Sequence, residues 1–420
     1  MSLLPVQDAV VSVLSRVRPL GPERVGLVEA VGRVLAESVT ATRRLPAWDN
    51  SAMDGYAVRT ADVSGPGITL PVEAAVAAGD VGERPLAPGT ATRIFTGAPL
   101  PPGADAVIIQ EDTEPGALPG TVTLRIIPRP GDNIRRTGTD VAPGAVLFTP
   151  GRPLTPGDLA LLAGQGRMSV AVHRAPRVAI VSSGNELLEL DAGEPGRGQI
   201  ANTNAWALAA AVRAAGGIPL LLPIVRDDRD ATRTALTQAS AGADMLLTSG
   251  GVSVGDHDHV GTTLKALCGA DFAFWKVAIR PGKPLIFGQI GACTAFGLPG
   301  NPVSALVTFE VFVRPAILRM LGHDACVRRP VNGRTVGALA GGGARTEYLR
   351  ATVRADEAGT LWIDAGRSQG SGSLSSLAGA DALVVRHPGC AAAQEGDGVE
   401  VLLLGPDEPG LRLSCRSSGS

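Results

Sequence analysis

Residues 246–259 combine a short apolar run with closely spaced glycines and two carboxylates. An apolar run that breaks into glycines is typical of a buried strand entering a loop whose backbone must approach a ligand. Gly250 and Gly255 have the spacing of a P-loop, but Asp256 stands where that loop carries lysine. Because a carboxylate repels a bare phosphate, Asp256 and Asp258 are candidate ligands of a hard cation such as Mg²⁺. A helix-capping aspartate is the alternative interpretation.

Three cations follow within eight residues, namely Lys276, Arg280 and Lys283. Further on, Asn301 and Pro302 have the residue types of an N-cap and a first helical position. Backbone N–H groups at such a helix start can face a bound anion. A capped helix start is common, but beside the two charged segments this one predicts a phosphate pocket.

Composition bounds the class of protein. A chain of 420 residues is long enough for two to four domains. With 38 basic and 40 acidic side chains the net charge is −2. The overall charge therefore does not favour binding to nucleic acid or to an anionic membrane. The five cysteines lie far apart without a CxxC pair, which argues against a disulfide framework or structural zinc. No signal peptide or membrane-spanning run is evident, so we expect a cytoplasmic protein.

The N-terminal third predicts two helices, over residues 5–17 and near residues 27–38. Residues 45–57 then combine carboxylates with aromatic and polar side chains. Such a mixture is common in functional loops. Short runs between residues 68 and 127 predict a small β-domain. Residues 142–175 give a strand, a short helix and a strand with too little apolar mass to stand alone. We expect them to pack on the N-terminal helices, which makes the β-domain an insertion.

From residue 176 the pattern alternates strands with helices, which predicts a parallel sheet with ligands at the carboxyl ends of its strands. Glu186 and Asp227 follow two of these strands, so they should lie near the loop that follows Thr248. Helix capping is the alternative role for both. An apolar helix over residues 302–321 should be buried and bent at Pro315, and short strands in residues 330–413 predict a closed β-domain.

Three further loops admit both a functional and a structural interpretation. Thr96 ends a strand before a glycine, where it could contact a substrate or complete a turn. The basic loop of residues 129–140 could bind an anion or lie on a solvated surface. The glycine- and serine-rich residues 369–376, which include Ser371, could bind a ligand or form a surface turn.

Six motifs occur in order along most of the chain. They are DNSAMDGYA (residues 49–57), FTGAPLPPGADAVI (95–108), NIRRTGTD (133–140), SGGVSVGDHD (249–258), WKVAIRPGKP (275–284) and GLPGNPVSA (297–305). Together they resemble the molybdopterin molybdenumtransferases, the MoeA family, which is related to the E domain of gephyrin. Six long matches in sequence are far more specific than one glycine loop.

The resemblance implies a multidomain α/β plus β fold in an elongated homodimer. It implies a discontinuous domain I, an inserted β-domain II, a central α/β molybdopterin-binding domain III with a parallel-type sheet, and a C-terminal β-barrel, domain IV. The corresponding ranges are 1–46 with 142–175, 47–141, 176–327 and 328–413, followed by a disordered tail over 414–420. The active cleft would lie between domain III of one subunit and domain II of the other.

The resemblance also implies a reaction, the Mg²⁺-dependent insertion of molybdate into adenylyl-molybdopterin with release of AMP. The implied catalytic residues are Asp54, Thr96, Glu186, Asp227, Asp258, Lys276 and Arg280. The implied substrate-binding residues are Ser249, Gly250, Gly251, Ser253, Lys283, Pro299, Gly300, Asn301, Ser304 and Ser371. The implied metal ligands are Glu186, Asp256 and Asp258.

Molybdopterin adenylyltransferase and molybdoenzymes or their chaperones are the partners that such a role implies. Two other functions fit the same resemblance, the adenylyltransferase step itself and a non-catalytic molybdopterin-binding scaffold. The flanking domains argue against the first, and the charged residues of the cleft argue against the second.

Two positions depart from the family pattern. Asn185 precedes Glu186 where relatives usually carry aspartate, which removes one charge from a metal shell. Arg280 stands where many relatives have lysine, which keeps the cation but changes its reach.

Overall fold

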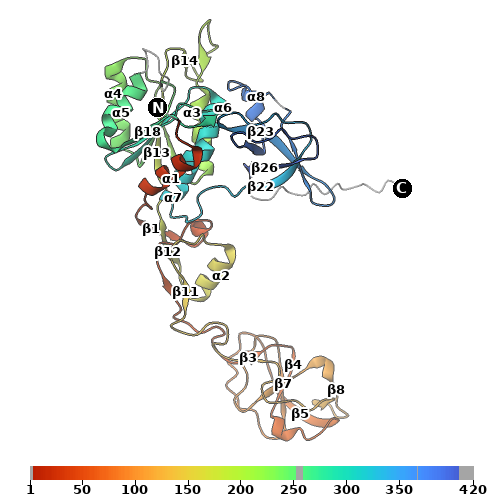
Figure 1. Ribbon diagram of the computed structural model, residues 1–420. Coiled ribbons are helices and arrows are strands. Elements are labelled where there is room, and N and C mark those ends of the chain that lie inside the picture. The colour runs from red at the N-terminus through yellow and green to blue at the C-terminus, as the bar shows by residue number, and fades with distance from the viewer. Residues whose placement is uncertain (1–2, 252–258, 367, 406–420) are drawn as a thin grey trace. The chain divides into compact units, whose positions relative to one another are not determined.

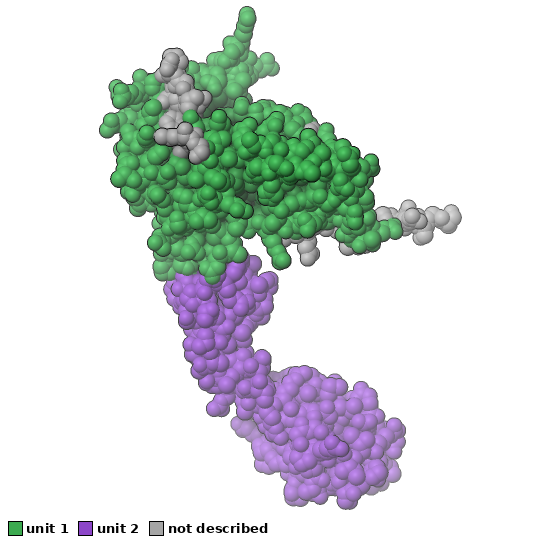
Figure 2. Space-filling view, in the orientation of Figure 1, with its two compact units in different colours: residues 1–23, 172–420 green, residues 24–171 purple. Residues whose placement is uncertain are grey.

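The computed structural model describes residues 3–251, 259–366 and 368–405. The expectations for Ser253, Asp256, Asp258 and the C-terminal tail therefore lie outside the described residues. The chain forms two compact units, coloured separately in Figure 2. Unit 1 comprises Met1–Glu23 with Val172–Ser420, and unit 2 comprises Arg24–Ala171. The division into four domains stays a prediction.

A six-stranded sheet forms the centre of unit 1. Its strands, in spatial order, are β16 (Ile218–Leu221), β13 (Arg177–Ser182), β17 (Met245–Ser249), β21 (Cys293–Leu298), β20 (Ile286–Ile290) and β18 (Phe272–Trp275). The first four run parallel, as the alternating pattern predicted. The strand β20 runs antiparallel to β21, with which it forms a hairpin, and β18 runs antiparallel to β20.

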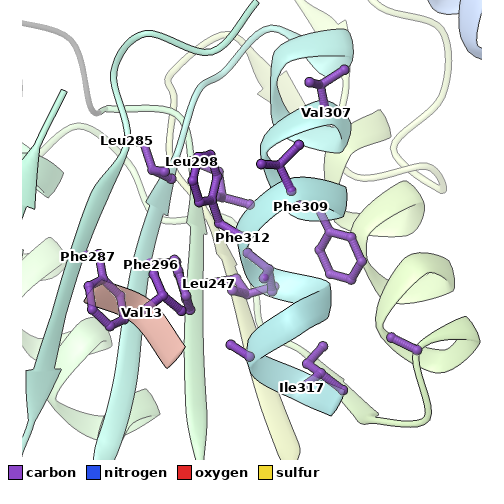
Figure 3. Close-up of a cluster of buried hydrophobic side chains, with 14 of the residues drawn as sticks. Val13, Leu247, Leu285, Phe287, Phe296, Leu298, Val307, Phe309, Phe312 and Ile317 are labelled. Atoms are coloured by element: carbon purple, nitrogen blue, oxygen red, sulfur yellow. The ribbon is translucent and has the colours of Figure 1, made fainter. Parts of the chain in front are cut away.

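Helices cover both faces of this sheet (Figure 1). Alternate residues of each strand point to opposite faces, so β17 places Met245 and Leu247 in one core and Leu246 in the other. The first core is packed by α1 (Val6–Arg16), α3 (Thr203–Ala214), α6 (Pro302–Thr308), the π-helix η5 (Phe309–Val313) and α7 (Arg314–Met320), as Figure 3 shows in part. The second is packed by α4 (Arg229–Ala241) and α5 (His259–Cys268).

The long apolar helix changes type where proline interrupts its hydrogen bonding. Pro315 has no N–H to donate to the carbonyl of Val311, one helical turn earlier. A π-helical turn over Phe309–Val313 lies at that point. The bend predicted at Pro315 thus coincides with an irregular turn, and the helix is buried as expected.

A closed five-stranded barrel forms the C-terminal part of unit 1. Its strands are β22 (Val331–Thr335), β23 (Thr346–Ala355), β24 (Leu361–Asp364), β25 (Ala382–Arg386) and β26 (Gly398–Leu403). The pairing of β25 with β23 closes the barrel. The short strand β19 (Ile279–Arg280) joins β23 in parallel and so ties the barrel to the α/β part. The remaining elements of unit 1 are β14 (Leu187–Leu188), β15 (Ile200–Ala201), η4 (Gly269–Asp271) and α8 (Leu374–Leu377).

Unit 2 contains the predicted small β-domain. Its six-stranded sheet has the order β7 (Ala106–Ile109), β4 (Gly55–Val58), β6 (Ala91–Ile94), β5 (Ile68–Val76), β9 (Thr121–Leu124) and β8 (Thr113–Pro115). Its other elements are η1 (Val28–Ala30), β2 (Val39–Thr40), β3 (Asn50–Ser51), η2 (Thr60–Asp62), η3 (Gln110–Asp112), β10 (Ile134–Arg135), β11 (Val146–Phe148) and α2 (Pro156–Gly164). The strands β1 (Pro22–Gly26) and β12 (Ser169–His173) pair with each other, and the chain passes from one unit to the other within each of them.

The helix predicted near residues 27–38 is wrong. Only the single 3-10 turn η1 forms there, and Gly32 then adopts a φ of 74° that leaves the helical region. Beyond it, the N–H groups of Gly32 and Leu35 donate to the carbonyls of Leu154 and Arg152. Pairing with a distant segment has replaced the local helix, which periodicity alone does not reveal. No helix in the described part of the chain is long and apolar enough to cross a membrane.

Candidate functional site

A pocket of about 900 Å³ lies where β13, β17 and β21 end. Parallel strands deliver their following loops to this edge, which is where α/β sheets bind ligands. Among the residues predicted from the sequence, Glu186, Asp227, Ser249, Gly250, Gly251, Pro299, Gly300 and Asn301 line it. The structure therefore brings together residues more than 100 positions apart in the chain.

Glycines allow the loops of this pocket to pack backbone against backbone. Gly250 has a φ of 90°, and a Cβ there would lie 2.6 Å from the Ser183 carbonyl oxygen. A Cβ on Gly300 would lie 3.5 Å from the Cα of Gly250. Side chains are excluded at Gly250 by both conformation and space, so the pocket presents backbone groups to a ligand.

Asp227 is held in place by the loop after β13. Its carboxylate accepts hydrogen bonds from the Ser183 hydroxyl at 3.1 Å and the Asn185 N–H at 3.2 Å. The Asn185 side-chain oxygen in turn accepts from the Asp227 N–H at 3.2 Å. The Asn185 side chain thus acts as a neutral acceptor that orients Asp227. Glu186 is exposed at the same pocket.

The described residues contain no cluster of three histidine, cysteine, aspartate or glutamate side chains close enough to bind a metal. They do place two carboxylates, Glu186 and Asp227, on one pocket. Carboxylate oxygens are the ligands that Mg²⁺ prefers. The donor types therefore fit Mg²⁺, while the other two predicted metal ligands, Asp256 and Asp258, lie outside the described residues.

The start of α6 differs from its prediction. Asn301 occupies the N-cap position, but its side chain makes no capping hydrogen bond and donates to the Ser371 hydroxyl at 3.1 Å. The Val303 N–H donates to the Ser371 carbonyl at 3.2 Å. The barrel loop therefore takes one of the backbone donors that we expected to face an anion. Ser304 is buried and is not among the lining residues.

Arg350 organises the barrel loop that carries Ser371. Its guanidinium is almost fully buried and donates to the carbonyls of Ser368 and Gly370 and to the Ser376 hydroxyl. Burial lowers the pKa of Arg350. Sequence reasoning missed this residue, because an arginine in a strand carries no local signal of its partners.

The three predicted cations differ in their surroundings. Lys276 and Lys283 lie on adjacent segments, since the Lys276 N–H donates to the Leu285 carbonyl and the Val277 N–H to the Lys283 carbonyl. Lys276 has a φ of 105°, which is unusual for a residue with a side chain. Arg280 forms an ion pair with Glu347 at 3.0 Å. None of the three cations is among the lining residues, although Pro284, next to Lys283, is one of them.

Unit 2 brings Asp54 and Thr96 together. The Asp54 carboxylate accepts the Thr96 N–H at 2.7 Å and its hydroxyl at 2.8 Å. These two hydrogen bonds, backbone first, lower the pKa of Asp54, and the charge of Arg93 adds to the effect. The carboxylate is therefore ionised and fixed in orientation, so Thr96 does more than complete a turn.

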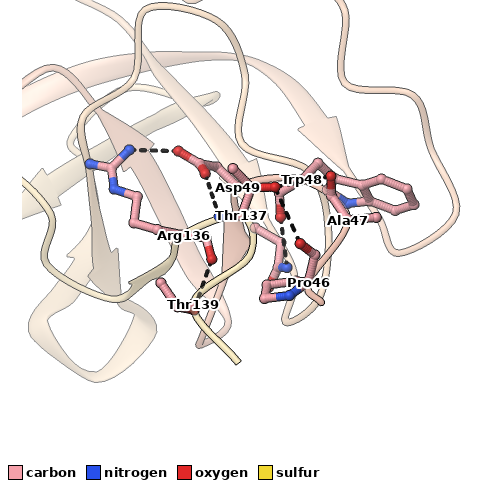
Figure 4. A network of polar contacts seen from close by, with 8 residues as sticks. Pro46, Ala47, Trp48, Asp49, Arg136, Thr137 and Thr139 are labelled. Carbon is pink, nitrogen blue, oxygen red and sulfur yellow. Dashed lines mark hydrogen bonds and ion pairs between the residues drawn. The ribbon is translucent and has the colours of Figure 1, made fainter. Parts of the chain in front are cut away.

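A second polar network lies in the loops at the start of this domain (Figure 4). Asp49 accepts from the Arg136 guanidinium at 2.6 Å and from the Thr137 N–H at 2.8 Å. The hydrogen bond from Thr137 is the largest cause of the lowered pKa of Asp49. Trp48, beside it, is 56% exposed. Asp49 thus holds the basic loop of residues 129–140 in place, and the charge of Arg136 is already paired with Asp49.

The Thr96 contacts predict a measurable pKa change in Thr96→Val. The variant keeps the backbone donor and loses the hydroxyl, so the pKa of Asp54 should rise toward the ordinary aspartate value. A lowered folded-state pKa contributes stability that is present above the unfolded value and is lost as pH falls through the folded value. Acid-induced unfolding should therefore begin at a higher pH in the variant than in wild type. Carboxyl ¹³C NMR titration checks this, with Thr69→Val as control because its hydroxyl is hydrogen-bonded to the Thr123 hydroxyl and not to a carboxylate. An unchanged Asp54 titration would show that the hydroxyl contributes nothing.

Several lining residues had no functional prediction. They are Leu187, Pro195, Gln199, Ile200, Ala201, Asn202, Thr203, Asn204 and Pro284. Asn202 and Asn204 gave a signal, but it indicated only a helix cap. Most of the others lie in β14, β15 and their connection, whose proximity to the pocket depends on the tertiary fold.

The structure is that of a multidomain protein with a polar ligand site at the carboxyl edge of an α/β sheet. Glycine backbone, hydroxyls and two carboxylates line this site. Comparison with known families extends this description. Residues 4–166 match the MoeA N-terminal region (domain I and II), residues 179–319 match the "probable molybdopterin binding domain", and residues 332–404 match the MoeA C-terminal region (domain IV).

Similar proteins cover nearly the whole chain. The molybdopterin molybdenumtransferase of Nostoc sp. is 40% identical over 91% of this chain and 88% of its own. That of Bacillus subtilis is 38% identical over 96% and 94%. A crystal structure of the molybdopterin biosynthesis MoeA protein of Pyrococcus horikoshii aligns with a TM-score of 0.82 at 30% identity, covering 96% of this chain and 100% of that one. This chain belongs to the molybdopterin molybdenumtransferase (MoeA) family, and it is a transferase.

Proposed function

We propose that this protein inserts molybdate into adenylyl-molybdopterin in a Mg²⁺-dependent reaction that releases AMP. The observation that carries the proposal is the pocket at the carboxyl edge of the sheet, where Glu186 and Asp227 stand beside glycine-lined backbone. Both reactants are anionic, so the site must combine charge neutralisation with close backbone contact. Family membership gives the class of reaction. The two carboxylates of the pocket support its Mg²⁺ dependence.

The protein's own groups bind and orient the reactants. Gly250, Gly251 and Gly300 let the backbone approach the phosphoanhydride, and the Ser249 hydroxyl lies at the end of β17. Lys276 and Lys283 supply positive charge close to Pro284 at the pocket wall. Positioning and electrostatics then carry the transfer without a covalent enzyme intermediate. A molybdate oxygen attacks the adenylyl phosphorus, the phosphoanhydride breaks with the molybdopterin phosphate as leaving group, and water then releases AMP.

Glu186, together with Asp256 and Asp258 outside the described residues, would hold the magnesium ion. Bound there, Mg²⁺ would neutralise the negative charge of the phosphate and molybdate oxygens. Asp227 keeps its carboxylate oriented through Ser183 and Asn185, so it serves to position the reactants or the ion.

The cleft is completed, in this proposal, by unit 2 of a partner subunit. The fixed, ionised carboxylate of Asp54 beside Thr96 supports a role in the reaction, because both lie exposed at a loop. Hybrid dimers test the arrangement. Equal mixing of Asp54→Ala and Glu186→Gln protomers gives about half heterodimers, each with one complete site if the cleft is shared, so about a quarter of wild-type activity should return. No recovery would show that each site lies within one protomer.

One assay tests the function itself. The protein is incubated with adenylyl-molybdopterin, molybdate and Mg²⁺, and AMP release is followed together with cofactor formation. AMP release that requires both molybdate and Mg²⁺ supports the proposal. Consumption of ATP with unmodified molybdopterin would identify an adenylyltransferase instead, and binding without turnover would identify a scaffold. We propose the cytoplasm as the site of action, with cofactor passed to molybdoenzymes or their chaperones.

A further inference from the structure

Asn204 connects three segments that build the pocket. It lies in the first turn of α3, and its side-chain amide nitrogen donates to the Ser249 hydroxyl and to the Gly300 carbonyl, both at 2.7 Å. Ser249 ends β17, and Gly300 lies in the turn before α6. One amide group therefore links the start of a helix to the two turns that line the pocket.

The orientation of this amide is determined by its partners. The Gly300 carbonyl only accepts hydrogen bonds, so the NH₂ group of Asn204 must face it. An amide nitrogen carries two hydrogens, and Ser249 and Gly300 use both of them. The side-chain oxygen of Asn204 is consequently fixed on the other side. It is buried and has no hydrogen-bond partner within the described part of the chain.

A buried acceptor without a partner costs stability. The gain from the two hydrogen bonds that Asn204 donates is therefore partly offset by this cost, so the residue is a poor choice for stability alone. Its effect is instead geometric. The Gly250 and Gly300 backbones lie close enough that a Cβ on Gly300 would contact the Gly250 Cα. Asn204 is the side chain that joins their two turns.

We infer that Asn204 is a positioning residue, which holds the Ser249–Gly251 and Pro299–Asn301 turns at the spacing needed to bind the phosphate end of the pterin substrate. This inference rests on the proposed function for the identity of the substrate. The helix-cap interpretation belongs to the neighbouring Asn202, whose side-chain oxygen accepts the Ala205 N–H. Asn204 therefore does not cap α3.

The test compares Asn204→Asp and Asn204→Ala with wild type. Asp has the same shape but places a carboxylate oxygen against the Gly300 carbonyl, whereas Ala removes both hydrogen bonds. We expect the KM for adenylyl-molybdopterin to rise at least about tenfold, with kcat within about threefold. The melting temperature of the Ala variant should stay within about 2 °C of wild type, because the lost hydrogen bonds are offset by removal of the unpaired oxygen. Asn332→Asp, exposed on β22, is the control for added charge.

Hydrogen exchange gives a second measurement that needs no substrate. In both variants, exchange should accelerate in peptides covering residues 245–251 and 293–301 and remain unchanged in the barrel and in unit 2. If wild type shows no turnover, the proposed function fails, and this exchange pattern still decides the role of Asn204. Unchanged KM with unchanged exchange would overturn the inference. A general loss of protection across unit 1 would also overturn it, since that is the result of a structural role.

Discussion

Glu186→Gln is expected to lower Mg²⁺-dependent AMP release by at least about 100-fold while the protein stays folded. The substitution keeps the size of the side chain and removes one negative charge from the pocket. Glu186 is exposed, so its replacement should cost little stability. If the carboxylate helps to hold Mg²⁺, the concentration of Mg²⁺ needed for half-maximal residual activity should rise as well. Steady-state assays across a Mg²⁺ titration measure both effects.

The matched control is Glu194→Gln. Glu194 is exposed on the connection between β14 and β15, beyond the loop that carries Glu186, and is not among the lining residues. It should retain wild-type turnover and Mg²⁺ dependence. Wild-type turnover in Glu186→Gln would show that the carboxylate is only a surface charge and would remove it from the site.

Lys276→Gly is expected to stabilise the protein and to inactivate it. A side-chain-bearing residue with a φ of 105° is strained by about 1–3 kcal/mol, which glycine does not suffer. In the proposed function the ammonium group helps to neutralise the anionic reactants, so its loss should lower turnover at least about 100-fold. Thermal unfolding and the AMP assay should therefore move in opposite directions.

Two further variants separate strain from charge. Lys276→Ala loses the charge but keeps the strain, so it should be as inactive as Lys276→Gly without the rise in melting temperature. Lys283→Gly should not gain stability, because Lys283 does not have a positive φ. A melting temperature below wild type in Lys276→Gly would contradict the account of strain at this position.

Much of the fold could be predicted because its causes are local. The continuous apolar runs of β13 and β17, which are buried on both faces, the glycines at the strand ends and the Asn202 cap of α3 each leave a local signal in the sequence. The parallel sheet, the small β-sheet of unit 2 and the closed barrel follow from such signals. The helix predicted near residues 27–38 failed because its hydrogen bonds go to Arg152 and Leu154, which no local pattern announces.

The loops of the candidate site could be predicted from the sequence, but the hydrogen bonds that hold these loops together could not. Glu186, Asp227 and Gly250 could be placed at one edge of the sheet because parallel strands end together. The roles of Asn204 and Arg350 could not, since each depends on carbonyl groups far away in the chain. Asn301 was expected to cap α6, but its amide is used by Ser371 from the barrel.

A crystal structure of the protein soaked with AMP and molybdate tests the central claim most directly, because molybdenum can be located by its anomalous scattering. The account predicts AMP phosphate against the Ser249–Gly251 and Pro299–Asn301 turns and a molybdenum peak in the pocket lined by Glu186 and Asp227. AMP and molybdenum bound elsewhere on the protein, with this pocket holding neither, would contradict it.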